Sequence, residues 1–283
     1  MNKRLVRDWM SPNPLTVYPQ STLLAAYTLM TAQHVRRLPV VDGEHLVGIL
    51  TLGDIREFKP SEAMTLSVFD TPNALAHLRV AHAMTPKVVT TTPDSAIHEA
   101  ARLMLSHKIA GLPVVDGEQL VGVITESDIF GALLSEFQSG RAPAVLVQHW
   151  MTPNPLTVGP KTKMPAARQL MNERHIRHLP VVDQGRLMGI VSLGDLRGAE
   201  PSPFTTLGTF ELTYLTTLMN VGEIMKYDPF AIAPTASIYE AAALMLAHKI
   251  GGIPVVDHDK LVGIISESDV LRMASQALSM ETA

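Results

Sequence analysis

Two short apolar runs, residues 38–41 and 46–50, stand on either side of a polar stretch that contains Asp42 and Gly43. An Asp-Gly pair between two apolar runs is typical of a tight β-hairpin, so this stretch predicts two antiparallel strands. The second run leads into Thr51 and Asp54, whose Thr-x-x-Asp spacing is typical of a helix start. The pattern therefore predicts a strand, a turn, a strand and a helix in succession.

A helical pattern precedes this hairpin. One face of the predicted helix carries Leu23, Ala26, Leu29 and Met30, and the same face recurs later in the chain as Ile97, Ala100, Leu103 and Met104. Methionines at this spacing are typical of core packing, so we predict that they are buried rather than part of a binding stripe. Hydroxyl residues stand where the helix N-caps are expected, at Ser21, Ser95, Thr162 and Ser237.

The whole pattern occurs four times. Pro39 recurs as Pro113, Pro180 and Pro254, and Asp54 recurs as Asp128, Asp195 and Asp269. Both sets have the same offsets, 74 residues within each half of the chain and 141 residues between the halves. Each copy opens with a methionine and a proline-containing loop, at Met10, Met84, Met151 and Met225. Constant offsets predict four copies of one unit, arranged as two tandem pairs.

Each unit is predicted to be β-α-β-β-α, which gives an α/β (α+β) fold class. Such a unit is too small to bury both faces of its sheet, so we expect units to pair. The predicted repeats are residues 1–60, 78–138, 145–200 and 219–279, with modules at 1–140 and 141–283 that form a disc-like assembly within one chain or across a homodimer. Segments 58–79 and 198–219 match each other and are expected to be the crossovers within the pairs, each ending in a helix. The domain boundary is expected near 135–145.

Composition narrows the class of protein. The chain has 283 residues, of which 46% are hydrophobic and 18% charged, so we expect a folded globular protein of about two domains. The net charge of -4 argues against a general nucleic-acid binder or an anionic-membrane binder. The chain contains no cysteine, which excludes disulfides and thiolate chemistry. No apolar run predicts a signal peptide or a membrane span, so a cytoplasmic protein is expected.

The sequence also argues against catalysis. It contains neither a Gly-rich phosphate-binding loop nor a Ser/His/Asp set in a recognisable context. The repeats use nearly all of the residues and leave no room for a catalytic domain. We therefore expect a protein that is not an enzyme.

The four Thr/Ser-x-x-Asp elements are candidate binding sites. They are Thr51/Asp54, Thr125/Asp128, Ser192/Asp195 and Ser266/Asp269. A helix start offers free backbone N–H groups to a phosphate, the hydroxyl adds a donor, and a carboxylate one turn later can accept hydrogen bonds from a ribose diol. The same spacing is also that of a capping box, in which the carboxylate serves its own helix. The pattern alone leaves both interpretations open.

A basic cluster precedes the first hairpin strand of each unit. It contains His34, Arg36 and Arg37 in the first unit, His107 and Lys108 in the second, Arg174, His175, Arg177 and His178 in the third, and His248 and Lys249 in the fourth. These cations suit phosphate groups, with arginine suited to bidentate contacts. Alternatively, they complement the helix dipole, an interpretation that we favour for Lys108 and Lys249. No metal site is expected, because the histidines lack a second ligand at metal-binding spacing.

A Met-x-Pro start, a Leu/Ile-Pro-Val-Val-Asp strand and a Gly-h-h-[Thr/Ser]-x-x-Asp end, repeated in tandem, resemble the CBS domain family, and paired copies resemble its two-domain Bateman module. The layout is similar to that of the gamma subunit of AMP-activated protein kinase. The resemblance implies a regulatory protein without a required cofactor, which binds adenosine-containing ligands in clefts between paired domains. It also implies that Asp54, Asp128, Asp195 and Asp269 bind ribose.

In the same family, the hydroxyls of Thr16, Thr90 and Thr157 are expected to line the nucleotide cleft. The fourth unit has Ala231 at this position, so its site is expected to be weak, empty or differently occupied. Arg56 and Arg197 follow the aspartate by two residues in the odd units, where they either reach a phosphate or face solvent.

From these features we expect an energy- or metabolite-sensing protein that binds AMP, ADP or ATP at up to four clefts. Ligand binding would shift the relative orientation of paired repeats and change a surface that a partner protein recognises. Two alternatives stay open at this point. The clefts could bind S-adenosylmethionine or another nucleoside without charge pairing, or the repeats could be a ligand-free assembly scaffold. The sequence does not identify the regulated partner.

Overall fold

The structure is a computed structural model that describes residues 4–57, 78–139, 145–199, 214 and 216–279. Contacts divide the chain into two compact units. Unit 1 comprises the described residues of Met1–Ala96 and His107–Thr125, and unit 2 comprises those of Ile97–Ser106, Glu126–Pro201 and Thr209–Ala283. The predicted crossovers lie mainly outside the described residues.

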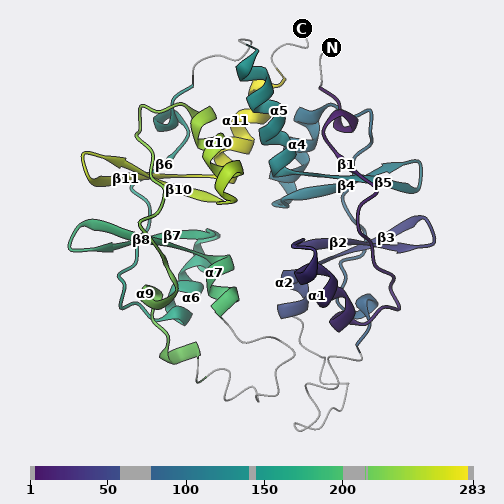
Figure 1. Cartoon of the computed structure of the whole chain (residues 1–283), viewed down its shortest axis with the longest axis horizontal. Helices are drawn as coiled ribbons and strands as arrows, with labels where there is room; N and C mark the ends of the chain where they lie inside the picture. Colours follow the sequence, from purple (N-terminus) through teal and green to yellow (C-terminus); the bar gives the residue numbers. More distant parts are fainter. Residues whose placement is uncertain (1–3, 58–77, 140–144, 200–213, 215, 280–283) are drawn as a thin grey trace. The chain divides into compact units, whose positions relative to one another are not determined.

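Unit 1 is built around two β-hairpins. Its elements are η1 (Val6–Asp8), β1 (Ser11–Pro12), α1 (Leu23–Ala32), β2 (Arg37–Asp42), β3 (His45–Thr51), α2 (Leu52–Glu57), η2 (Val80–His82), β4 (Gly111–Asp116) and β5 (Gln119–Thr125). Strand β5 connects the hairpins, because it pairs with β4 along its length, with β1 at its centre and with β3 at Gln119. Figure 1 shows α1 and α2 on the same side of hairpin β2–β3.

Unit 2 contains two further hairpins and the longer helices. Its elements are α4 (Ile97–His107), α5 (Glu126–Gln138), η3 (Val147–His149), β6 (Thr152–Pro153), α6 (Met164–Arg174), β7 (His178–Asp183), β8 (Arg186–Ser192), α7 (Leu193–Ala199), α9 (Val221–Ile224), β9 (Lys226–Tyr227), α10 (Ile238–His248), β10 (Gly252–Asp257), β11 (Lys260–Ser266) and α11 (Glu267–Ala277). Strands β7, β8 and β9 form one sheet, and β10, β11 and β6 form another. Helix α5 packs against α10 and α11 (Figure 1).

The hairpin prediction is confirmed in all four repeats, each strand being a residue or so longer than the apolar run that predicts it. Each hairpin has the same irregularity, a shift of register between the first and second residues that follow the proline, as at Val40/Val41. In the hairpin turns the chain reverses direction through residues with positive φ. These residues are Gly43, Gly117, Gln184, Gly185, His258 and Asp259. The short strand predicted after each opening loop is reduced to a single parallel bridge, such as Val17 to Val40.

The predicted helix faces are mostly buried, with Leu29 and Leu103 half-buried at their edges. Leu23, Ala26 and Met30 lie in one core cluster together with Leu38 and Leu50. The methionines of α1 and α4 are almost completely buried, at 0% exposure for Met30 and 1% for Met104. Unit 2 has an equivalent cluster, which contains Met164, Ala167, Met171, Leu179 and Val191. These methionines are therefore core residues, as the spacing predicts.

The predicted helix N-caps are wrong by one residue in the first three repeats, because α1, α4 and α6 begin two residues after Ser21, Ser95 and Thr162. Helix α1 begins at Leu23, and Thr22 is its N-cap, with Oγ1 accepting a hydrogen bond from Ala25 N at 3.1 Å. Ser21 instead closes the preceding turn, because its Oγ accepts a hydrogen bond from Tyr18 N. Thr162 is likewise displaced by Lys163 at the N-cap of α6, and Ser95 accepts from Thr92 N. Ser237 is the N-cap of α10, as predicted.

The opening loop of each repeat pairs with the other repeat of its pair. Strand β1 of repeat 1 lies on β5 of repeat 2, and Thr85 of repeat 2 bridges Ile49 of repeat 1. Gly48 permits this approach, because a Cβ at this position would lie 2.8 Å from Met84 Sδ. The same glycine-methionine packing recurs at Gly122/Met10, Gly189/Met225 and Gly263/Met151. Paired repeats therefore complete each other's sheets by reciprocal exchange of their opening loops.

Candidate functional site

The Thr51/Asp54, Ser192/Asp195 and Ser266/Asp269 elements form capping boxes. Asp54 Oδ2 accepts hydrogen bonds from Thr51 N at 2.7 Å and Thr51 Oγ1 at 2.8 Å, while Asp54 N donates to Thr51 Oγ1 at 3.2 Å. The same carboxylate contacts are made by Ser192 with Asp195 and by Ser266 with Asp269. The capping interpretation is therefore correct for these three elements. Capping uses one carboxylate oxygen of each aspartate, Oδ2, so the ribose interpretation concerns the other oxygen, Oδ1.

The second carboxylate oxygen differs among the repeats. Within the described residues, Asp54 Oδ1 has no hydrogen-bond or ion-pair partner, and the residue is half-buried. Asp195 Oδ1 lies 3.7 Å from Lys226 Nζ, with 20% of the Asp195 side chain exposed. Asp269 Oδ1 accepts a hydrogen bond from Arg272 Nη2, and Asp269 is buried. The three sites are therefore chemically inequivalent.

The candidate hydroxyls and aspartates meet at one end of each hairpin. Val17 N donates to Pro39 O, so the neighbouring Thr16 lies beside the beginning of β2. At that same end Arg37 is paired with Thr51, from which α2 begins. The third repeat repeats this register with Thr157 and with His178 paired to Ser192. Thr90 and Thr125 occupy the equivalent register in the second repeat, beside Gly111.

In each unit a nitrogen-containing side chain of the odd repeat reaches the strand start of the even repeat. Arg37 Nη1 donates to Gly111 O at 3.4 Å, and a Cβ at Gly111 would lie 2.9 Å from that same nitrogen. In unit 2 the ring of His178 lies over Gly252, where a Cβ would meet ring Cγ at 2.9 Å. The even repeats therefore have glycine at the strand start because the side chain from the odd repeat occupies the space.

The His178 imidazole is a poor cation. Burial lowers the pKa of His178 from 6.5 to about 4, with the positive charges of Arg177 and Lys226 adding to the effect and Asp195 opposing it. The ring is therefore neutral at neutral pH. It can donate one N–H to an anion but adds no positive charge.

The other basic residues include two arginines and four residues at helix ends. Arg36 is exposed, and Arg177 Nη2 lies 3.6 Å from Glu267 Oε2 of the fourth repeat. Four residues at the ends of the predicted helices have left-handed backbone, with φ of 52–53°: His34, Lys108, His175 and Lys249. The N–H of the residue after His34 returns to Met30 O at 2.9 Å, which is a Schellman end. These four residues therefore lie at the C-terminal ends of their helices, and a role of the Lys108 and Lys249 charges toward the helix dipole stays a prediction.

Sequence reasoning missed Lys226. This residue lies on β9 in the opening loop of the fourth repeat, yet β9 pairs with β8 of the third repeat and brings Lys226 to Asp195. The equivalent residues in the other loops are Ser11, Thr85 and Thr152. The sequence does show a lysine where the other three loops have a hydroxyl residue. This difference points to Asp195 only once the pairing of β9 with β8 is known.

Two negative findings apply to the described part of the chain. No three His, Asp or Glu side chains come together there in a group that could hold a metal ion. No helix within the same residues combines the length and hydropathy of a membrane span.

Comparisons with known proteins agree with this geometry. A protein of Methanocaldococcus jannaschii, MJ1225, is 31% identical over 280 residues, which are 95% of this chain and 98% of that protein. The crystal structure of MJ1225, described as a proposed archaeal homologue of g-AMPK, matches with a TM-score of 0.75 at 28% identity and covers 95% of this chain and 99% of that one. A conserved protein from Pyrococcus horikoshii has the same fold, with a TM-score of 0.66 at 24% identity over 95% of this chain and 99% of that chain.

The family model for the CBS domain matches residues 6–61, 80–135, 147–202 and 221–275. These four matches cover most of the chain and coincide with the four hairpin-containing repeats. They confirm both the expected family and the α+β fold class. The chain belongs to the CBS domain family.

Proposed function

We propose that this protein is a regulatory sensor that binds adenine nucleotides (AMP, ADP or ATP) in clefts between paired CBS repeats. The Asp54 carboxylate carries the proposal. Asp54 is half-buried; one of its oxygens caps α2, and the other has no partner in the described residues. A partly desolvated carboxylate oxygen gains free energy from a hydrogen-bond donor, and a ribose diol supplies two.

The residues around Asp54 suit the rest of a nucleotide. Thr16 supplies a hydroxyl at the same end of the hairpin, beside Thr51, whose own hydroxyl and N–H donate to Asp54. Arg37 lies beside this end and is half-buried. A guanidinium in such a setting binds phosphate more strongly than one in bulk water, because it is less screened.

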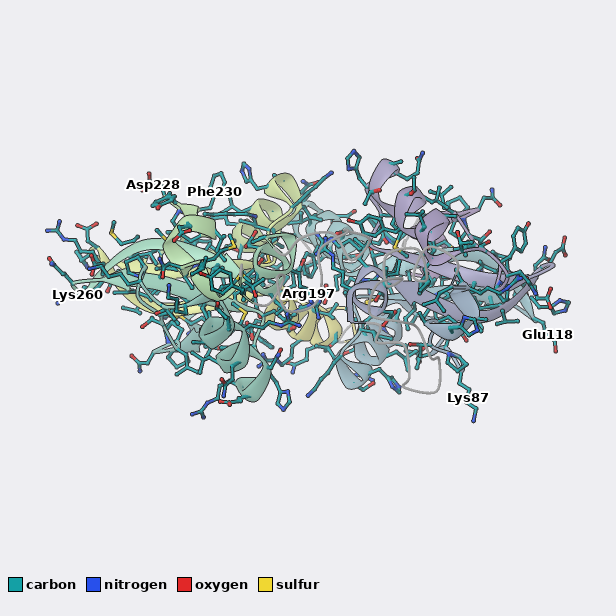
Figure 2. The ribbon with its side chains drawn as sticks, turned by 90° about the horizontal axis from the view of Figure 1, so that it is seen from below. Lys87, Glu118, Arg197, Asp228, Phe230 and Lys260 are labelled. Atoms are coloured by element: carbon teal, nitrogen blue, oxygen red, sulfur yellow. The ribbon has the colours of Figure 1, made fainter. Side chains whose placement is uncertain are left out.

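The residue before the cleft-hydroxyl position, which is Ala231 in the fourth repeat, supports binding of an adenine base. It is apolar in every repeat, as Leu15, Val89, Leu156 and Phe230. Leu15 and Leu156 are each 44% exposed, whereas Phe230, which Figure 2 shows near Asp228 on the loop that follows β9, is stacked on His248. An exposed apolar side chain at the same register in these repeats gains free energy when a flat ring covers it.

Transmission would use the contacts that join paired repeats. Arg37 reaches Gly111 O in unit 1, and Arg177 reaches Glu267 in unit 2. A phosphate that binds these arginines replaces contacts between repeats with contacts to ligand, so the relative orientation of the repeats shifts with occupancy. We propose that an unidentified partner protein recognises this shift and that the chain itself is not catalytic.

A nucleoside ligand without phosphate is the second candidate, and unit 2 favours it. There Arg177 is already paired with Glu267 and His178 is neutral, so less free positive charge faces a ligand. S-adenosylmethionine represents this class. The two candidates differ in their dependence on the arginines.

Isothermal titration of ligand-free protein with AMP, ADP, ATP, S-adenosylmethionine and adenosine tests the proposal. We expect saturable heat with at least one phosphorylated nucleotide, and a loss of at least about tenfold in its affinity in Arg37→Met, which is about 1.4 kcal/mol. Adenosine affinity is the control and should change little in that variant. No heat from any of these ligands contradicts the proposal, while equal loss for adenosine and AMP contradicts the role of Arg37.

A further inference from the structure

The fourth repeat has an arginine that the other repeats lack. The residue three positions after the ribose-binding candidate is Glu57, Gly131 and Gly198 in the first three repeats and Arg272 in the fourth. Positions three apart on a helix are neighbours on one face. Arg272 is therefore positioned to act on the carboxylate of its own repeat.

The structure brings this arginine to the carboxylate. Asp269 Oδ2 accepts hydrogen bonds from Ser266 N at 2.9 Å and Ser266 Oγ at 2.6 Å, and Asp269 Oδ1 accepts from Arg272 Nη2. Asp269 is 4% exposed, whereas Asp195 of the same unit has 20% of its side chain exposed and its Oδ1 lies 3.7 Å from Lys226 Nζ, which is beyond hydrogen-bonding distance. A neutral ribose hydroxyl gives a weaker hydrogen bond than a guanidinium, so it does not displace Arg272 without a net loss.

Two further departures affect the same repeat. Ala231 replaces the threonine that lines the cleft in the other three repeats, which removes a hydroxyl. The preceding Phe230 stacks on His248, with ring centroids 3.8 Å apart and planes at 25°. The apolar face expected to cover an adenine base is therefore already in contact with another ring.

We propose that Arg272 acts as an internal counter-ion that closes the fourth repeat to nucleotide, so that the ligand site of repeat 3, around Asp195, serves unit 2 alone. The inference rests on the proposed nucleotide-binding function and specifies which repeats perform it. Repeat 4 then has a structural role, in which it completes the third repeat with β9 and holds Arg177 through Glu267.

Transfer of the arginine to the third repeat tests the inference. Gly198 is exposed on α7, and a Cβ at this position has no heavy atom within 4 Å, so an arginine is accommodated there. With AMP as the probe, equilibrium dialysis of the full chain should show that Gly198→Arg binds one equivalent less than the wild type, or binds it at least tenfold more weakly. Gly198→Ala is the matched control and should bind like the wild type.

The reciprocal measurement removes the carboxylate charge from the fourth repeat. Asp269→Asn should bind as many equivalents of AMP as the wild type, whereas Asp195→Asn should lose one. The inference is overturned if Asp269→Asn loses an equivalent while its melting temperature shows that it is folded. It is equally overturned if Gly198→Arg binds AMP like Gly198→Ala.

Melting of the ligand-free protein tests the pair of Asp269 and Arg272 without relying on nucleotide binding. If the wild-type protein binds no AMP, that result contradicts the proposed function and leaves the melting test in force. Asp269→Asn and Arg272→Met should each lower the melting temperature, and the double variant should melt no lower than the less stable single variant, since both changes break one pair. Additive losses would show that the two side chains do not interact, and the internal counter-ion would be excluded.

Discussion

Replacement of Asp54 separates its capping role from ligand binding. Asp54→Ala removes an oxygen that accepts two hydrogen bonds from Thr51, at 2.7 and 2.8 Å. Hydrogen bonds to a charged group contribute about 1.5–3 kcal/mol, and loss of a helix cap costs about 0.5–2 kcal/mol. Water partly replaces these contacts because the site is half-buried, so we expect a loss of about 1–2 kcal/mol in the free energy of unfolding. This corresponds to about 2–8 °C in melting temperature.

Asp54→Asn keeps a neutral acceptor for Thr51 but cannot accept from both hydroxyls of a ribose diol. We therefore expect it to lose less than about 1 kcal/mol of stability, while both variants lose at least about tenfold in AMP affinity at one site. Calorimetric melting and isothermal titration measure the two effects, with the exposed hairpin residue Asp42 changed to Asn as the control. If Asp54→Asn binds AMP like the wild type, the carboxylate serves α2 alone and the ribose role is refuted.

Three further predictions concern packing, a buried hydroxyl and pH. Gly48→Ala should lower the melting temperature because its Cβ would lie 2.8 Å from Met84 Sδ, whereas Gly198→Ala, with open space at its Cβ, should be neutral or stabilising. Thr91→Val should raise the free energy of unfolding by about 1 kcal/mol, because the buried Thr91 hydroxyl has no hydrogen-bond partner in the described residues; an unchanged or lower value in denaturant titration would contradict this. The folded-state pKa of His178, about 4, lies below its ordinary value of 6.5, so the unfolded chain binds more protons between these values. Stability should therefore fall by on the order of 3 kcal/mol as pH drops from about 6.5 to 4, and His178→Gln should fall less over the same range.

The repeat architecture was predictable because each local signal recurs at fixed offsets. An Asp-Gly turn between apolar runs predicts the hairpin around Asp42, and helical spacing predicts burial of Met30. The N-cap of α1 was misplaced at Ser21, since adjacent Ser21 and Thr22 offer the same chemistry and only the turn closed at Tyr18 distinguishes them. Which of two adjacent hydroxyl residues caps a helix depends on backbone geometry, which the residue types alone do not determine.

The four repeats, their hairpins and the spacing of each aspartate from its capping hydroxyl are predictable from the sequence, because these features depend on neighbours within a few residues. Which loop completes which sheet depends on contacts between distant parts of the chain. The tertiary structure brought Lys226 to Asp195 through the pairing of β8 with β9, and it placed Arg37 over Gly111. Such contacts join residues far apart in the chain, where local periodicity carries no information about partners. The candidate sites therefore differ in the origin of their cations, because tertiary pairing brings Lys226 to Asp195 whereas Arg272 reaches Asp269 within one turn of the same helix.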